Sequence, residues 1–169
     1  MRSLFDIDTK DYDLNGWICV RPSARSIIIK NNKIAMVHSL THGFYKFPGG
    51  GIEPNETPIE AMIRETKEES GLIVKANTIK EFGQVHRIQK GDPEDVFIQD
   101  NYYYLCDAED ETVPLCLDEY EENDKYSLEF VDVHTAIKEN MKHPKENDPI
   151  ETERETRVLE ILLIEGLVK

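Results

Sequence analysis

The chain has 169 residues, of which 39% are hydrophobic, and this length and composition predict one globular domain over residues 1–169 rather than a disordered segment. The formal net charge is −14 and no basic run exceeds two residues, which excludes a large nucleic-acid-binding face, so we expect no nucleic-acid partner. An acidic protein that handles an anionic substrate would need metal ions between the two.

The cysteines and the apolar segments indicate the cellular compartment of the protein. Cys19, Cys106 and Cys116 are widely spaced and include no C-x-x-C pair, which favours free thiols in a reducing compartment. No segment has the apolar core of a signal peptide or the roughly 18 apolar residues of a membrane span. We therefore expect a cytoplasmic protein with no membrane partner.

The N-terminal part of the chain predicts a loosely held start followed by short strands. The first dozen residues are mixed and acidic. Strands are expected over residues 17–20, 24–30 and 33–39, and the Asn31-Asn32 turn signal joins the last two into a hairpin.

A glycine-rich turn follows. Residues 44–47 precede Pro48, which favours an extended chain before it. Gly49, Gly50 and Gly51 permit positive φ and a close approach of the backbone to a ligand. Taken alone, the three glycines are better explained as an ordinary tight turn.

A helix with clear end signals comes next. Thr57 and Glu60 have the spacing of a capping box, and Pro58 occupies the first helical position, where its missing N–H costs nothing. The helix is expected to end near Ser70, with Gly71 just beyond it.

Two faces of this helix differ in character. Ile59, Met62, Ile63 and Thr66 have the spacing of a buried stripe. Glu65, Glu68 and Glu69 are neighbours on another face, where like charges repel one another. A solvated acidic face and a site for a hard cation such as Mg²⁺ explain this spacing about equally well.

The remainder of the chain predicts alternating strands, loops and helices. Strands are expected over 72–74, 78–86, 97–107 and 126–133, and helices over 134–141 and 150–167. Residues 89–95 and 142–149 are expected to be connections, and the strongly acidic residues 109–125 a loop.

The glycine turn and the helix together match a long motif. Gly50, Glu56 and the run Arg64-Glu65-Thr66-Lys67-Glu68-Glu69-Ser70-Gly71-Leu72 resemble the Nudix box, G-x5-E-x7-R-E-U-x-E-E-x-G-U, in which U is a bulky aliphatic residue. The box covers 23 residues, and Thr66 departs from it at the first U position. We expect Thr66 to pack its methyl group at a small cost.

The resemblance implies a fold, a reaction and a cofactor. The fold class would be α/β (α+β), the Nudix fold, with a mixed β-sheet sandwiched between helices. The reaction would be metal-dependent hydrolysis of a nucleoside diphosphate linked to another moiety, with Mg²⁺ or Mn²⁺ as cofactor. The partners would be a small nucleotide-type substrate and, because dimers are common in the family, a second copy of the chain.

The resemblance also implies roles for individual residues. Glu68 and Glu69 would be the main metal ligands, and Glu65 would be a further ligand or the base that activates water. Gly50 would offer its carbonyl to the metal, while Glu56 and Arg64 would orient the site as an ion pair. One more acidic ligand is expected from residues 109–125, where we favour Glu122 over Glu119, Glu121 and Asp124.

Substrate contacts are less well marked by the sequence. His86 and Arg87 form a small basic group that could contact phosphate, although a solvated strand end explains it better. Tyr102 could stack on a base, although packing in the sheet is the alternative. The candidate substrate contacts are Arg25, Phe44, His86, Arg87 and Tyr102.

Three functional hypotheses follow. The first is a metal-dependent diphosphate hydrolase, and the alternative of the same fold is a catalytically inactive nucleotide-binding or regulatory module. The third is an interaction protein whose acidic face is only solvated. An inactive module would have a broken glutamate set, whereas Glu65, Glu68 and Glu69 are all present, which favours the enzyme and leaves its substrate open.

Overall fold

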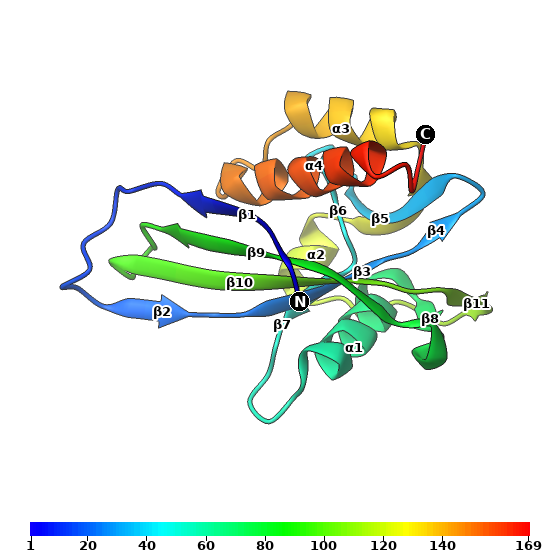
Figure 1. Ribbon diagram of the computed structural model, residues 1–169, viewed down its shortest axis with the longest axis horizontal. Coiled ribbons are helices and arrows are strands. Elements are labelled where there is room, and N and C mark those ends of the chain that lie inside the picture. Colours follow the sequence, from blue (N-terminus) through cyan, green and yellow to red (C-terminus); the bar gives the residue numbers. More distant parts are fainter.

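A computed structural model describes residues 1–169 and shows a mixed sheet between two layers of helices (Figure 1). The strands of the large sheet lie in the order β1 (Ser3–Asp8), β9 (Lys80–Gln89), β10 (Val96–Leu105), β3 (Ser23–Ile27) and β7 (Gly49–Gly51), with β2 (Ile18–Val20) also pairing with β10. The β1–β9 and β10–β3 pairs are parallel, whereas the β9–β10 and β3–β7 pairs are antiparallel.

Two smaller sheets complete the strands. One has the order β12 (Tyr126–Val131), β5 (Lys33–Ser39) and β4 (Ile29–Lys30), with β6 (Tyr45–Lys46) paired to β5. The other joins β11 (Ala108–Thr112) to β8 (Leu72–Val74). The helices are α1 (Pro58–Ser70), α2 (Glu119–Asn123), α3 (Val133–Lys142) and α4 (Pro149–Ile164), with a 3-10 turn at Ala76–Thr78.

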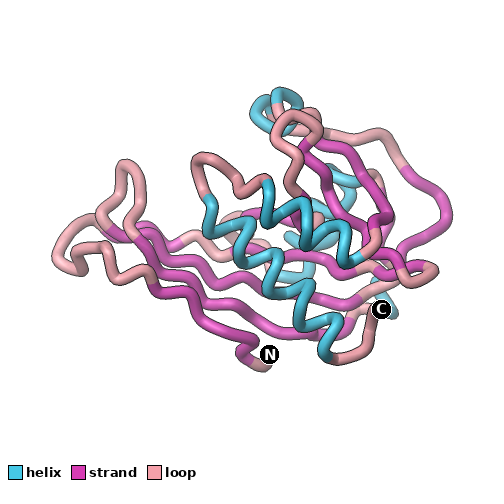
Figure 2. Tube along the Cα trace, turned by 90° about the horizontal axis from the view of Figure 1, so that it is seen from above, coloured by secondary structure: helices cyan, strands magenta, loops and turns pink.

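The helices cover opposite faces of the large sheet. Helix α1 lies below the sheet and the α3–α4 pair above it in Figure 1, and in Figure 2 strands extend past the helices at one end. Successive side chains of β10 point to opposite faces of the sheet, so this strand contacts both layers of helices. Tyr103 packs in a cluster with Leu159 and Leu162 of α4, and Tyr104 packs in a second cluster with Met62 of α1. The expected architecture, a mixed sheet sandwiched between helices, is confirmed.

The predicted strand over residues 24–30 divides between two sheets. Its first part is β3 in the large sheet, and its second part is β4, which forms the expected hairpin with β5. Asn31 and Asn32 have φ of 53° and 61°, the left-handed conformation that a two-residue hairpin turn requires.

Two predictions about irregular segments are wrong. The first dozen residues include β1, which pairs with β9 in a contact between segments far apart in the chain. The acidic residues 109–125 contain most of β11 and all of α2. In α2, Asp118 and Glu121 form a capping box, which shows that part of this acidic composition serves local helix formation. None of the helices combines the length and apolar character needed to cross a membrane.

Candidate active site

The helix that carries the glutamates begins where the sequence predicts. The Thr57 side chain accepts a hydrogen bond from the Glu60 N–H, and the Glu60 carboxylate accepts one from the Thr57 N–H at 2.8 Å. Gly71 ends the helix with a φ of 70°. These local signals fix the angular positions of Glu65, Glu68 and Glu69 around the helix axis.

The buried stripe of α1 is rotated from the predicted one. Met62 and Thr66 are fully buried as expected, but Ile59 is 41% exposed and Glu69 is 1% exposed. Polar residues can occupy the buried face because each has a partner. The Thr66 hydroxyl donates to the Ser26 hydroxyl at 2.9 Å, and Glu69 pairs with Lys46.

An acidic cleft of about 440 Å³ opens beside this helix. Its acidic lining residues are Glu53, Glu65, Glu68, Asp118 and Glu121, and its basic lining residues are Arg21 and Arg64. Five carboxyl groups against two guanidinium groups leave the cleft with an excess of negative charge. Such a surface attracts cations and would repel a diphosphate that came without them.

Arg64 donates hydrogen bonds to three carboxylates and to the glycine turn. Its guanidinium donates two hydrogen bonds to the Glu56 carboxylate, from Nε at 2.9 Å and from Nη2 at 3.0 Å. The same Nη2 also donates to the Gly51 carbonyl at 3.1 Å. Its Nη1 donates to Glu65 at 2.7 Å and to Glu68 at 3.1 Å. The hydrogen bonds from Arg64 lower the pKa of Glu56. Arg64 therefore ties the glycine loop to the helix.

Gly50 brings the main chain against Glu65. A Cβ atom at position 50 would lie 2.5 Å from the Glu65 Oε2, so only glycine leaves room for this carboxylate. Burial raises the pKa of Glu65, and the hydrogen bond from Arg64 opposes that shift. The Glu65 carboxylate therefore packs directly against the main chain at Gly50.

Glu69 lies deeper than Glu65 and Glu68. Its Oε1 accepts a hydrogen bond from the Lys46 ammonium at 2.6 Å, and its Oε2 accepts one from the Gly49 N–H at 3.0 Å. Burial raises the pKa of Glu69 to about 7, against the opposing effect of Lys46. Glu69 does not line the cleft in this arrangement.

The cleft fits a hard divalent cation in its chemistry. Its donors are carboxylate oxygens, which Mg²⁺ and Mn²⁺ prefer, and the contact at Gly50 is one that a side chain would block. No three acidic, histidine or cysteine side chains of the chain already converge as a ligand cluster. Because Arg64 bonds both Glu65 and Glu68, a cation would compete with it for these carboxylates.

The structure places Glu121, rather than Glu122, in the cleft. Glu121 is 4% exposed and lines the cleft, whereas Glu122 faces solvent on α2. Glu121 is therefore the better-placed residue of this segment, and the preference for Glu122 stays a prediction. The sequence could not distinguish the two because successive residues of a helix point about 100° apart, and the prediction for this segment contained no helix.

Three of the predicted substrate contacts are in the interior. Arg25, Phe44 and Arg87 are 4%, 1% and 2% exposed, and none of them lines the cleft. Arg25 and Arg87 are held in ion pairs with Glu151 and Asp148, respectively. These ion pairs suit a supporting role in the fold for Arg25 and Arg87, and the assignments as substrate contacts stay predictions.

The other two candidates stay near the surface but outside the cleft. His86 pairs with Asp100 at 2.8 Å across β9 and β10. Tyr102 is partly buried against the cluster under α1. Neither side chain is among those that line the cleft.

Arg21 is a cleft residue that sequence reasoning missed. Its Nε would lie 3.4 Å from a Cβ atom at Gly51, and its side chain is exposed. Arg64 is committed to three carboxylates, whereas Arg21 forms no ion pair with the cleft carboxylates. Its position between β2 and β3 carries no sequence signal, because it depends on pairing of these strands with β10.

A mixed sheet between helices, with a capped glutamate-bearing helix beside a glycine turn, defines a protein of the Nudix class. The family model described as the NUDIX domain matches residues 20–152, and the chain belongs to this family.

Solved structures share the fold. A NUDIX hydrolase from Nitrosomonas europaea superposes with a TM-score of 0.57 at 16% identity, over 80% of this chain and 89% of that one.

Curated relatives match a short part of the chain. An 8-oxo-dGTP diphosphatase from Proteus vulgaris is 51% identical over 22% of this chain and 33% of its own length. An ADP-ribose pyrophosphatase from Methanocaldococcus jannaschii is 43% identical over 31% of this chain and 33% of its own. An RNA pyrophosphohydrolase from Hydrogenovibrio crunogenus is 43% identical over 36% of this chain and 35% of its own. The chain thus spans about a third of the length of these relatives.

Proposed function

We propose that the chain hydrolyses the diphosphate linkage of a small nucleotide-type substrate with the help of Mg²⁺ or Mn²⁺. The observation that carries this proposal is the acidic cleft, in which Glu65 contacts the main chain of Gly50 and lies beside Glu68 and Glu121. The names of the three relatives all describe cleavage of phosphate anhydrides, which supports the same reaction class.

The metal supplies charge neutralisation and a lower pKa for the water bound to it. We assign Glu68 and Glu121 as the cleft carboxylates that would hold it, together with the Gly50 carbonyl, and Glu65 as a further ligand or as the base. Glu69 accepts from Lys46 and from the Gly49 N–H, so it would have to give up its contact with Lys46 to hold the metal as well. Arg64 and Glu56 keep the turn and the helix at a fixed separation.

The side chains of the cleft then have distinct roles in the reaction. The oxygen of a water molecule attacks one phosphorus atom, the bond from that atom to the bridging oxygen breaks, and a proton leaves the water. Glu65 either receives this proton or ligates the metal. Its burial, which raises its pKa, suits the first role. The guanidinium of Arg21 contacts a phosphate oxygen of the substrate.

The charge of the cleft favours a small substrate over a long polyanion. Arg21 is the one lining cation that is not committed to cleft carboxylates. A nucleic acid would need several cations along its backbone. ADP-ribose, a dinucleotide polyphosphate, a sugar nucleotide or an oxidised nucleotide needs few.

The test is hydrolysis of these four substrate types with Mg²⁺ or Mn²⁺, read by the release of phosphate or nucleotide products. An RNA oligonucleotide with a 5′-terminal polyphosphate is the fifth substrate. We expect at least one small nucleotide to be cleaved, and cleavage to stop when EDTA removes the metal. Cleavage of the RNA alone would contradict the proposed substrate class, and no cleavage of any of them would favour the inactive module.

A further inference from the structure

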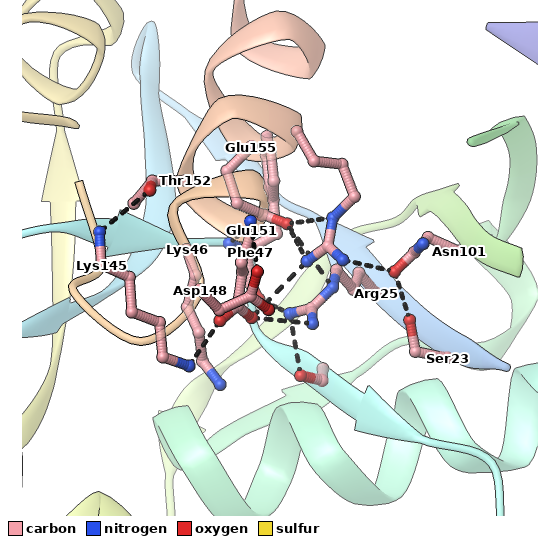
Figure 3. A network of polar contacts seen from close by, with 12 residues as sticks. Ser23, Arg25, Lys46, Phe47, Asn101, Lys145, Asp148, Glu151, Thr152 and Glu155 are labelled. Atoms are coloured by element: carbon pink, nitrogen blue, oxygen red, sulfur yellow. Dashed lines mark hydrogen bonds and ion pairs between the residues drawn. The ribbon is translucent and has the colours of Figure 1, made fainter. Parts of the chain in front are cut away.

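The main chain that leads into the Gly50 turn is held by buried charges from outside the turn. The Arg25 Nη1 donates to two carbonyls, those of Phe47 and Gly49, each at 3.0 Å. The Glu155 Oε2 accepts from the Phe47 N–H at 2.8 Å. Figure 3 shows Arg25, Phe47 and Glu155 in this network. One strand and one helix therefore clamp the same short segment.

The clamp leaves few free groups in the segment. The Pro48 carbonyl accepts from the Ser26 N–H at 2.9 Å, and the Gly49 N–H donates to Glu69. Gly49 itself has a φ of 142°, and a Cβ atom there would lie 2.2 Å from the Ala24 carbonyl oxygen. The backbone polar groups of residues 47–49 thus all have partners, and the turn has little freedom to move.

The two charged partners come from distant parts of the chain. Arg25 lies on β3, and Glu155 lies on α4, beyond the residues that the family model matches. Their side chains are 5% and 0% exposed, and the Arg25 Nε lies 3.6 Å from the Glu155 Oε1. The Arg25 Nε has no hydrogen-bond partner, so this pair is held by charge, and buried charges persist only beside charges of the opposite sign.

We propose that Arg25 and Glu155 are positioning residues that set the affinity of the cleft for its metal by fixing the main chain of residues 47–49, and through it the turn that packs against Glu65. This inference rests on the proposed function, in which the cleft holds the metal. Neither residue touches the cleft, so each acts through the main chain of residues 47–49. A guanidinium fork is needed at position 25 because one ammonium group cannot reproduce its planar, fixed set of donors.

The test measures binding of Mn²⁺ alone, by electron paramagnetic resonance, to the wild-type chain and to Arg25→Lys. This substitution keeps the buried positive charge but replaces the planar guanidinium group with an ammonium group. The matched control is Arg87→Lys, because Arg87 is also buried in an ion pair, with Asp148, but contacts neither Glu155 nor residues 47–49. Thermal unfolding in EDTA establishes that each variant is folded.

We expect Arg25→Lys to weaken Mn²⁺ binding by about tenfold, the effect of losing one charge-assisted hydrogen bond, and Arg87→Lys to change it by less than about twofold. Unchanged affinity in Arg25→Lys, or an equal loss in both variants, would overturn the inference. If Arg25→Lys does not fold, Glu155→Gln is measured in its place, with the same outcomes. Absence of Mn²⁺ binding by the wild-type chain would overturn the proposed function, and this inference with it.

Discussion

Two groups of charged residues lie on either side of the glycine turn, and they differ in balance and exposure. In the cleft, five carboxyl groups face two guanidinium groups, and the Glu68 side chain is 37% exposed. Behind the turn, three basic residues (Arg25, Lys46 and Arg154) match three acidic ones (Glu69, Glu151 and Glu155), and all six are buried. The buried group pairs its charges internally, whereas the cleft has an excess of negative charge and gains by binding a cation.

The largest expected effect is on the free energy of unfolding, which should depend on the buried group and not on the cleft. Arg25→Met leaves Glu151 and Glu155 with one fewer buried partner, and we expect the free energy of unfolding to fall by about 3–5 kcal/mol. Urea denaturation in EDTA measures it. The control is Arg21→Met in the cleft, which is exposed and should change this free energy by less than about 0.5 kcal/mol. An equal fall in the free energy of unfolding in both variants would show that the two groups do not differ in their contribution to stability.

The second effect is on activity. Glu68→Gln removes a proposed metal ligand from the exposed side of the cleft, and we expect hydrolysis to fall by about 100-fold or more because metal-based charge stabilisation is worth several kcal/mol. Steady-state rates at saturating metal measure it. Glu122→Gln is the matched control because Glu122 lies on α2 but faces solvent. An equal fall in Glu122→Gln would return the extra ligand to the residue that sequence alone favoured.

A smaller effect concerns the cation of the cleft. Arg21→Gln should raise KM by about tenfold and leave kcat within about threefold, because the contact with phosphate forms in the bound substrate as well as in the transition state. Lys33→Gln, a charge change on the hairpin away from the cleft, controls for net charge. A fall in kcat at constant KM would instead give Arg21 a role confined to the transition state.

The smallest effect concerns the departure from the box at Thr66. Its hydroxyl bonds Ser26 rather than only packing its methyl group. Thr66→Val should lower the free energy of unfolding by about 1 kcal/mol, the net value of one buried hydrogen bond, with hydrolysis unchanged. Thermal unfolding and rates under the same conditions measure both. A gain in stability would show that the aliphatic residue of the box fits better here.

The sequence predicted the parts of this site that depend on neighbours in the chain. Thr57, Glu60 and Gly71 define the ends of α1 because capping acts over one turn of helix. The ion pair between Arg64 and Glu56, which the resemblance to the Nudix box implied, joins this helix to its adjoining loop.

Contacts between distant segments could not be predicted in this way. The hydrogen bond between Phe47 and Glu155 spans 108 positions, and no local pattern marks either partner. Arg25 was therefore predicted as a substrate contact although its guanidinium group lies in the interior. The buried position of Glu69 depends on Lys46, a residue of another element, which explains why its face of α1 was predicted wrongly.

The central claim is that the cleft carboxylates bind the metal that the reaction needs. Titration of Mn²⁺ into the wild-type chain and into the double variant Glu65→Gln, Glu68→Gln, followed by electron paramagnetic resonance, tests it directly. We predict binding by the wild-type chain and a loss of at least about 100-fold in affinity in the folded double variant, since both substitutions remove charged oxygen ligands. Wild-type affinity in the double variant would contradict the claim.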